Sequence, residues 1–308
     1  MNKNIIYISA LCLAVVIAAV SFFVLKAVPD KRLYPDKIDK AALIYDRAKD
    51  FAKEKDYNKA INALVVGLSQ YPDSKYTEKY LRELASIYHE KGDTVKARYY
   101  YSRLLKNFPD VKDASEIRSR VEAFNMDMML SPAITEDSME YVVQSGDTLF
   151  AIAKKFGTTI GLLKKVNGLK GDLIVPGQKL KVVVSQFSLF VDKSDNILVL
   201  RKDGEPLKTY IVSTGKDNST PVGVFKIEEK MVRPVWYKVN AVVSPDSDEY
   251  ELGERWMGLS KQGYGIHGTN DEGSIGKQIT QGCVRMRNNE VIELYDIVPS
   301  GTEVEIVD

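Results

Sequence analysis

Cysteine and histidine are nearly absent from this chain, whose 308 residues contain only two of each. Cys12 lies in an apolar run near the amino terminus and Cys283 lies near the other end, so no disulfide can form beyond that run. His89 and His267 are far apart in sequence, and with one cysteine they cannot complete a zinc shell. We therefore expect no metal site and no cofactor.

Neither sign of charge dominates, because 43 basic and 42 acidic residues give a formal net charge of +1. A surface that binds nucleic acid by neutralising phosphates needs an excess of lysine and arginine. We therefore expect no nucleic-acid partner. The length of 308 residues is too great for one typical core and suits two or three modest domains.

Charge is missing altogether from residues 5–25, a predominantly apolar run of 21 positions. A helix of this length just spans a hydrocarbon layer of about 30 Å. The apolar region of a cleaved signal peptide usually covers only about 7 to 15 residues and ends at a small-x-small site. We expect residues 1–27 to be an uncleaved membrane anchor, with a signal sequence as the alternative. Basic residues on both flanks leave its orientation open.

Residues 38–127 contain a sequence repeat with a displacement of 37 positions. Asp56 and Ala60 recur as Asp93 and Ala97, and an aromatic-Pro-Asp triplet ends each copy. Apolar residues keep helical spacing, and helix pairs of this kind bury their apolar faces only by stacking. The pattern resembles tetratricopeptide repeats, which implies a scaffold for a protein partner. A helical spacer is the alternative, and in either case His89 is expected to be structural.

A polar linker is expected at residues 128–139, and residues 140–184 then combine two short strands with two helices. Asp147 can cap a helix that holds Leu149, Ile152 and Phe156, and a Pro-Gly pair turns into the last strand. This segment closely resembles the LysM module, a strand-helix-helix-strand unit. The resemblance implies binding to the N-acetylglucosamine-containing glycan of peptidoglycan. It assigns the binding groove to Gly146, Asp147, Thr148, Leu149, Ile174, Val175 and Pro176, of which the glycine and the proline also serve the turns.

Residues 187–308 are rich in strand-like runs. Gly, Pro and Asp turns separate these runs, which cover 196–200, 208–212, 224–227 and 302–307. Such spacing favours a β-sandwich or barrel-like fold over a wound α/β sheet, with one longer helix at 289–298. The whole chain is thus predicted to be a multidomain α+β protein. Its parts are an N-terminal transmembrane helix, α-helical repeats, a small βααβ module and a mainly-β C-terminal domain.

The reactive groups of this last domain are His267 and Cys283, sixteen positions apart. A thiolate is the reactive form of cysteine, and a neighbouring imidazole can generate it near neutral pH by accepting the proton. Gly282 permits a tight turn whose backbone N–H groups can stabilise an oxyanion. The segment 263–268 also satisfies G-x-G-x-x-G, but a loop follows it instead of a helix, so no dinucleotide site is expected.

Six segments in order look like the YkuD-type L,D-transpeptidase family over residues 187–308. They cover 211–216, 220–225, 264–270, 274–276, 282–286 and 294–302. The resemblance implies a mainly-β catalytic domain that forms a cysteine-linked acyl-enzyme with a tetrapeptide stem of peptidoglycan. The attack is on the L-centre carbonyl of diaminopimelate, D-alanine leaves, and the acyl group passes to an amine acceptor.

Residue by residue, the resemblance makes Cys283 the nucleophile, His267 the base and Gly268 the carbonyl donor that orients the imidazole. One position departs from the family's usual Ser-His-Gly-Cys, because Gln281 stands in place of the histidine. That histidine is not the base, which comes from the intact Tyr-Gly-Ile-His segment. We therefore expect activity to survive, with a possible change in rate, pH profile or substrate preference.

The same resemblance assigns the groups around the nucleophile. Gln281, Gly282 and Cys283 would supply oxyanion N–H groups, with Tyr264 as a cavity wall or donor. Arg285 suits a carboxylate of the stem, because guanidinium binds carboxylates bidentately. A structural ion pair is the alternative for Arg285.

The combined expectation is a membrane-anchored, extracytoplasmic L,D-transpeptidase of the bacterial cell envelope. Its partners would be peptidoglycan, the membrane through residues 1–27 and a protein through the repeats. Binding of the glycan would raise the local concentration of stems around Cys283. Two alternatives stay open. One is an L,D-carboxypeptidase or cross-link hydrolase of the same fold, and the other is a non-catalytic peptidoglycan-binding scaffold, which only the replacement at Gln281 supports.

Overall fold

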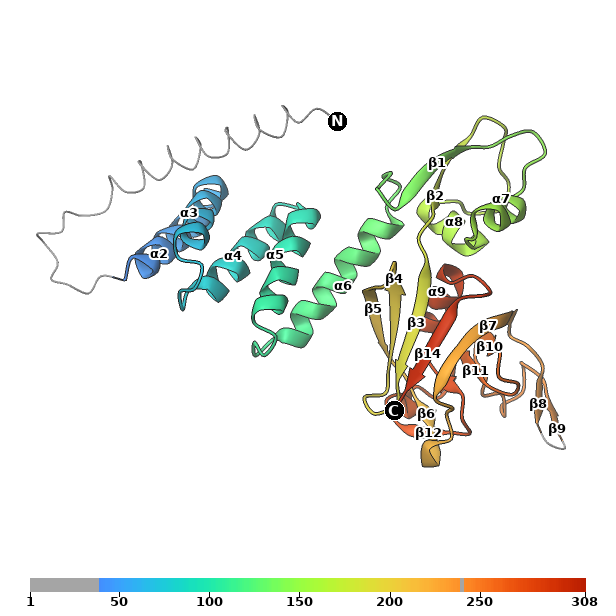
Figure 1. The fold of residues 1–308 in the computed structure, drawn as a ribbon. Helices are drawn as coiled ribbons and strands as arrows, with labels where there is room; N and C mark the ends of the chain where they lie inside the picture. Colours follow the sequence, from blue (N-terminus) through green and yellow to red (C-terminus); the bar gives the residue numbers. More distant parts are fainter. Residues whose placement is uncertain (1–38, 239–240) are drawn as a thin grey trace, which may run out of the picture. The chain divides into compact units, whose positions relative to one another are not determined.

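A computed structural model describes residues 39–238 and 241–308 (Figure 1). The chain divides into two compact units, the first ending at Phe124 and the second running from Asn125 to Asp308. No helix within the described residues is long and apolar enough to cross a membrane. The anchor predicted at residues 5–25 lies outside those residues.

The first unit is helical, as the repeat predicts. Its helices are α2 (Lys40–Lys53), α3 (Tyr57–Gln70), α4 (Thr77–Glu90), α5 (Thr94–Asn107) and the first part of α6 (Ala114–Leu130). The equivalent aspartates Asp56 and Asp93 cap α3 and α5, because each carboxylate accepts from a main-chain N–H three residues on. The displacement of 37 positions therefore relates two helix starts with the same capping geometry.

Tyr80 lies at the centre of the core of the first unit. Its side chain is fully buried, and its hydroxyl donates to the carbonyl of Ala41 over 2.7 Å. The ring lies against Gly67, where an added Cβ would come within 2.6 Å of it. Small residues at Ala48 and Ala85 let the neighbouring helices approach closely.

The second unit begins with the end of α6 and a βααβ module. The module consists of β1 (Ser138–Val142), α7 (Leu149–Phe156), α8 (Ile160–Val166) and β2 (Lys179–Val183), with β1 and β2 antiparallel. The predicted helix cap is wrong by one residue. Thr148 accepts from the N–H of Ala151, while Asp147 accepts from Tyr141 and from the N–H of Gln144. Asp147 thus holds the turn before the helix.

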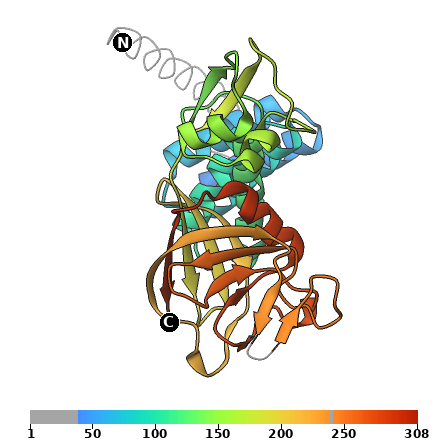
Figure 2. The same cartoon turned by 90° about the vertical axis from the view of Figure 1, so that its right-hand side faces the viewer.

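The rest of the second unit is built on an eight-stranded sheet in the order β13-β11-β10-β7-β14-β3-β4-β5 (Figure 2). The strands are β3 (Phe187–Asp192), β4 (Ile197–Lys202), β5 (Glu205–Ile211), β7 (Gly223–Val232), β10 (Arg255–Leu259), β11 (Gly265–His267), β13 (Val284–Arg285) and β14 (Glu303–Val307). Two pairs are parallel, β14 with β3 and β11 with β13, and the others are antiparallel. The domain is therefore mainly β, as predicted.

Short elements complete this domain beside the sheet. They are β6 (Thr214–Gly215), a 3₁₀ turn η2 (Lys216–Asn218), β8 (Trp236–Lys238), β9 (Ala241–Val243), a 3₁₀ turn η3 (Glu272–Ser274), β12 (Gln278–Thr280) and α9 (Asn288–Ile297). The strands β8 and β9 form an antiparallel hairpin, and β12 pairs with β6 in parallel. The helix α9 lies within one residue of the predicted range.

Helix α8 of the βααβ module packs into the hydrophobic core of the sheet domain, while the module keeps a smaller core of its own. Leu162 and Val166 of α8 pack in the same cluster as Leu294 and Ile297 of α9. Gly161 lies against Asp296, where an added Cβ would come within 2.7 Å of the aspartate Cβ. The module therefore packs directly on α9. A larger residue at position 161 would have to displace Asp296 or move the two helices apart.

Candidate active site

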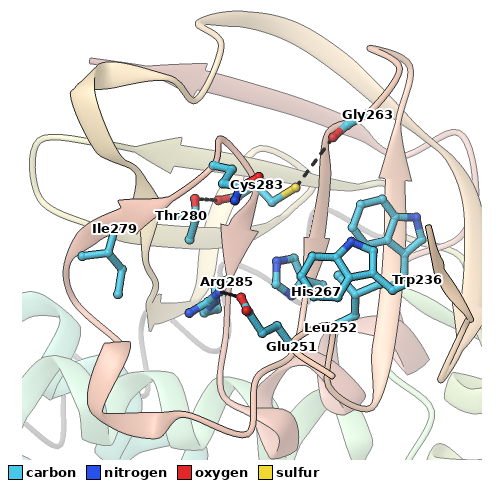
Figure 3. Close-up of a pocket in the computed structure, with 11 residues that line it drawn as sticks. Trp236, Glu251, Leu252, Gly263, His267, Ile279, Thr280, Cys283 and Arg285 are labelled. Carbon is cyan, nitrogen blue, oxygen red and sulfur yellow. Dashed lines mark hydrogen bonds and ion pairs between the residues drawn. The ribbon is translucent and has the colours of Figure 1, made fainter. Parts of the chain in front are cut away.

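One cavity in the sheet domain contains both predicted reactive groups. Its volume is about 520 Å³ (Figure 3). The residues around it are Trp236, Glu251, Leu252, Trp256, Gly263, His267, Ile279, Thr280, Gln281, Cys283 and Arg285. We refer to it as the Cys283 cavity.

Adjacent strands bring the thiol and the imidazole to this cavity. His267 ends β11, and its register partner on the parallel strand β13 is Arg285. Side chains of paired residues lie on the same face of a sheet, and those two positions apart on one strand share that face. Cys283 immediately precedes β13, two residues before Arg285. The three side chains therefore lie on the same side of the sheet and line one cavity, although His267 and Cys283 are sixteen positions apart in sequence.

The imidazole of His267 is held in its neutral form. Its side chain is buried, and Nδ1 lies 2.7 Å from the carbonyl oxygen of Gly268. A carbonyl only accepts hydrogen bonds, so Nδ1 carries the proton and Nε2 keeps a lone pair. Burial lowers the pKa of His267 to about 4, and the positive charge of Arg285 acts in the same direction. Gly268 thus has the orienting geometry that the sequence predicts.

The Cys283 thiol is also neutral at rest. Burial raises the pKa of Cys283 above its ordinary value, against smaller opposing effects from a main-chain hydrogen bond with Gly265 and from Arg285. The Sγ atom lies 3.8 Å from the carbonyl oxygen of Gly263, to which the thiol donates. The expectation of a thiolate formed by the imidazole near neutral pH therefore needs correction. Burial disfavours the charged forms of both groups, so they rest as thiol and free imidazole.

Thr280 fixes the loop that carries the nucleophile. Its hydroxyl donates to the carbonyl of Cys283 over 2.7 Å and accepts from the N–H of Gly282 over 3.2 Å. The N–H of Gly282 is thus directed at Thr280, in contrast to the oxyanion donor that was expected. Gly282 instead supplies a φ of +125° and the absence of a Cβ, which would lie 2.7 Å from the Tyr264 ring. Tyr264 packs behind the loop and is not among the cavity-lining residues.

Arg285 lines the cavity with Cys283 and is mostly buried. Its Nη2 is 2.9 Å from a carboxylate oxygen of Glu251, and its Nη1 is 3.4 Å from the hydroxyl of Ser274. Only 11% of the Arg285 side chain is exposed, and its Nε has no hydrogen-bond partner among the described residues. A carboxylate that enters the cavity can therefore find a donor on Arg285.

The site residues predicted from the sequence do not include Trp236, Glu251 and Trp256, which also line the cavity. Both tryptophans of the chain are in this set. They lie in or next to a segment without regular periodicity, and hairpin β8–β9 carries the first of them.

The predicted glycan-binding residues of the βααβ module lie on two loops that meet. Main-chain hydrogen bonds of Val143 with Gly177 and Gln178 join the β1–α7 side to the loop before β2. Val175 and Pro176 are exposed, and Gly146 has a φ of +87° that suits the turn. Leu149 is buried in the core of the module, so only its main chain can face a ligand. Among the described residues, no three His, Cys, Asp or Glu side chains group as metal ligands.

Comparison with known families matches three segments of the chain. A model described as the L,D-transpeptidase catalytic domain matches residues 186–306, and a LysM domain model matches residues 141–183. A third model, described as an outer membrane lipoprotein, matches residues 37–146.

Several curated proteins and solved structures are similar to this chain. "Putative L,D-transpeptidase YkuD" of Bacillus licheniformis is 37% identical over 54% of this chain and 97% of its own length. "Putative L,D-transpeptidase YqjB" of Bacillus subtilis is 40% identical over 39% of this chain and 70% of its own. A solved L,D-transpeptidase from Mycobacterium smegmatis is 21% identical, with a TM-score of 0.35, over 44% of this chain and 65% of its own.

Proposed function

The chain belongs to the YkuD family of L,D-transpeptidases, and from that membership we propose a peptidoglycan L,D-transpeptidase that uses Cys283 as its acylated nucleophile. The observation that carries the proposal is that the cavity contains one thiol and one imidazole, with the imidazole oriented by Gly268. The donor is a tetrapeptide stem attacked at the L-centre carbonyl of diaminopimelate.

In the first half-reaction, the sulfur of Cys283 attacks the carbonyl carbon while Nε2 of His267 takes the thiol proton. The C–S bond forms, the C–N bond to D-alanine breaks, and the protonated imidazole returns its proton to the leaving amine. In the second half-reaction, an acceptor amine gives a proton to His267 and attacks the thioester. The new amide forms, the C–S bond breaks, and the thiol recovers its proton.

Because both groups rest uncharged, proton transfer accompanies the attack and does not precede it. The N–H groups of Gln281 and Cys283 are the main-chain donors of this loop that we assign to the oxyanion. A donor aimed at the developing charge contributes roughly 3 to 4 kcal/mol in well-studied enzymes. The N–H of Gly282 is left out of this set because it already donates to the hydroxyl of Thr280.

Arg285 binds a carboxylate of the donor stem in this proposal. Its free Nε–H faces a mostly buried site, and its charge is balanced by Glu251 until the substrate arrives. A charge-assisted bond of this kind is stronger than a neutral one and also fixes geometry. The ion pair with Glu251, the alternative for Arg285, is present and coexists with substrate binding in this proposal.

In this proposal, the LysM module binds the glycan strand of the same substrate. The matches to LysM and to the transpeptidase domain indicate a protein of the cell envelope that works outside the cytoplasm. We assign glycan contacts to Gly146, Asp147, Thr148, Val175 and Pro176, to the main chain of Leu149 and, less directly, to the half-buried Ile174. Residues 1–27 would hold the chain at the membrane, and the helical repeats would bind a protein partner.

Incubation of the full chain with tetrapeptide-rich sacculi tests the function. We expect release of D-alanine and, by mass spectrometry, a stem-sized adduct on Cys283 that Cys283→Ala abolishes. Added D-amino acid should yield exchange products. D-alanine release without exchange would indicate a carboxypeptidase, and neither release nor adduct would indicate a binding scaffold.

A further inference from the structure

The base of the proposed site is covered by an aromatic ring. The indole of Trp256 stacks on the imidazole of His267, with ring centroids 5.9 Å apart and an angle of 24° between the planes. Trp256 on β10 is the direct register partner of His267 on β11, so both side chains lie on the same face of the sheet. Both also line the Cys283 cavity.

Two glycines form the floor under this indole. Gly258 and Gly265 are register partners, two positions from Trp256 and His267 on their strands. A Cβ on Gly265 would lie 2.6 Å from the six-membered ring of Trp256, and one on Gly258 would lie 3.1 Å from its Nε1. Any side chain at either position would therefore push the indole away from the sheet.

The remaining edges of the indole are held as well. Its Nε1–H donates to a carboxylate oxygen of Glu229 on β7 over 3.2 Å. Its apolar part packs with the buried Tyr250 and Leu252, which precede β10. Contacts with the glycine floor, Glu229 and this cluster leave the ring little freedom to move.

We propose that Trp256 is the positioning residue of the base: its indole keeps the imidazole of His267 against the Gly268 carbonyl and screens it from water. The inference rests on the proposed function, in which Nε2 of His267 accepts the thiol proton. A ring that could turn about its bond to Cβ would lose the Nδ1 bond to Gly268 and would present the wrong nitrogen. An unscreened ring would bind a proton at a higher pH, and below that pH it could not act as a base.

Several charged or titratable groups line the same cavity as the imidazole. They are Arg285 on β13, Cys283 just before it and Glu251 in the segment before β10, while Glu229 lies on the far edge of the indole. Arg285 opposes a second positive charge, but burial is the larger cause of the low pKa of His267. Loss of the indole should therefore expose the imidazole to water and raise the pKa of His267.

Titration of the histidine rings of the full chain by NMR tests this role without any substrate. The chain has only two histidines, so His89 supplies an internal reference in every spectrum. In the wild type, we expect the pKa of His267 to be about 4. In Trp256→Leu, it should rise above about 5, toward the ordinary value of about 6.5. The matched control Glu229→Gln keeps an oxygen acceptor for the indole and should leave the His267 titration unchanged.

A smaller aromatic ring decides the question if the leucine variant does not fold. Trp256→Phe covers less of the imidazole, so its His267 pKa should lie about 0.5 above that of the wild type. An unchanged His267 pKa in the folded variants, whatever happens to activity, would reduce Trp256 to a packing residue and overturn the proposal.

The pH dependence of turnover provides a second readout. With a base pKa of about 4, kcat/KM at pH 5 should be about 0.9 of its plateau. In Trp256→Leu, the ratio should fall below about 0.5, with recovery at pH 7.5. A ratio that stays at the wild-type value would count against the proposal. Because the NMR titration needs no turnover, failure of the proposed function cannot be confused with failure of this inference.

Discussion

The resting state of Cys283 decides how its reactivity depends on pH. The Cys283 thiol is half-buried and the His267 imidazole is buried, and burial favours the uncharged form of each. Many reactive cysteines instead rest as a thiolate beside a cation, which makes them reactive toward alkylating agents well below pH 8. Arg285 is the cation in the Cys283 cavity, but Glu251 is 2.9 Å from it and offsets its charge. Proton transfer during the attack is the route that this environment leaves open.

Alkylation of Cys283 by iodoacetamide should therefore rise continuously with pH. Because burial raises the pKa of Cys283 above its ordinary value, very little of the thiol is ionised at pH 7. The alkylation rate should increase about tenfold per pH unit between pH 6 and 8.5. Peptide-level mass spectrometry follows the reaction and separates Cys283 from Cys12. The control His267→Asn should show a profile of the same form. A rate plateau between pH 5 and 8 that this variant abolishes would contradict the neutral pair.

Thr280 offers a second prediction at the residue scale, because one hydroxyl makes both hydrogen bonds that close the nucleophile loop. Thr280→Val keeps the shape but leaves the Cys283 carbonyl and the Gly282 N–H without partners. A misplacement of about 1 Å at a reacting group can cost about 10²-fold in rate, so kcat for D-alanine release should fall by about that factor. Thr280→Ser keeps the hydroxyl and should stay within a few-fold of the wild type. Equal activity of the two variants would show that the loop does not need the two hydrogen bonds of the hydroxyl.

At the scale of the elements, side chains from outside helix α9 satisfy the carbonyls at its carboxyl end. The last carbonyls of a helix lack partners within it and need other donors. Here Nζ of Lys230 donates to the carbonyls of Tyr295 and Val298 over 2.6 and 2.7 Å, and the hydroxyl of Thr159 donates to that of Asp296. Lys230 reaches them from β7, while Thr159 belongs to the LysM module. Two separate parts of the second unit thus complete one helix terminus.

Lys230 makes the stability of this unit depend on pH. Burial lowers the pKa of Lys230 to about 8, against an ordinary value of 10.5. Between these values the unfolded state binds more protons than the folded state, so stability rises with pH through this window. Between pH 7 and pH 9, the free energy of unfolding of the wild type should gain roughly 1 kcal/mol relative to Lys230→Met.

Urea unfolding at both pH values, followed by tryptophan fluorescence, measures this difference. Other groups that titrate in the same range are common to both proteins and cancel in the comparison. Lys230→Met also removes the donor for two carbonyls, so it should be less stable at either pH. A gap between the two proteins that does not widen at pH 9 would mean that Lys230 keeps an ordinary pKa.

The elements were more predictable than the surroundings of the site. The 37-residue displacement predicted repeated helix pairs, and Asp56 and Asp93 recur within it because helix capping is local chemistry, written within a few residues. The His267 and Cys283 segments were found because the chain has so few of either residue. Trp256 was missed because its role depends on strand register and on glycines at 258 and 265. The engagement of Gly282 was missed because a threonine two residues earlier competes for its N–H.

At the scale of the whole molecule, the boundary between the two units falls inside α6. The helix contributes Phe124 to the core of the first unit and Met126 and Met129 to that of the second. Lys181 of the LysM module, itself buried, donates to the carbonyls of Met129 and Ser131 at the end of this helix. The residues predicted as a linker therefore include the last turn of α6. Each unit nevertheless has a separate hydrophobic core.

Separate cores predict two unfolding transitions in the full chain. Four helices of 14 residues each lie in the first unit, so far-UV circular dichroism is weighted toward it. Both tryptophans lie in the second unit, so their fluorescence reports on that unit alone.

Leu84 and Leu294 are fully buried leucines, one in each core, and truncation of either to alanine costs about 2 to 5 kcal/mol. Leu84→Ala should move the dichroism transition to lower urea and leave the fluorescence transition in place, whereas Leu294→Ala should move the fluorescence transition. If Leu84→Ala shifted both curves together, α6 would couple the two cores into one cooperative unit, and the stability of the catalytic site would then depend on the helical repeats.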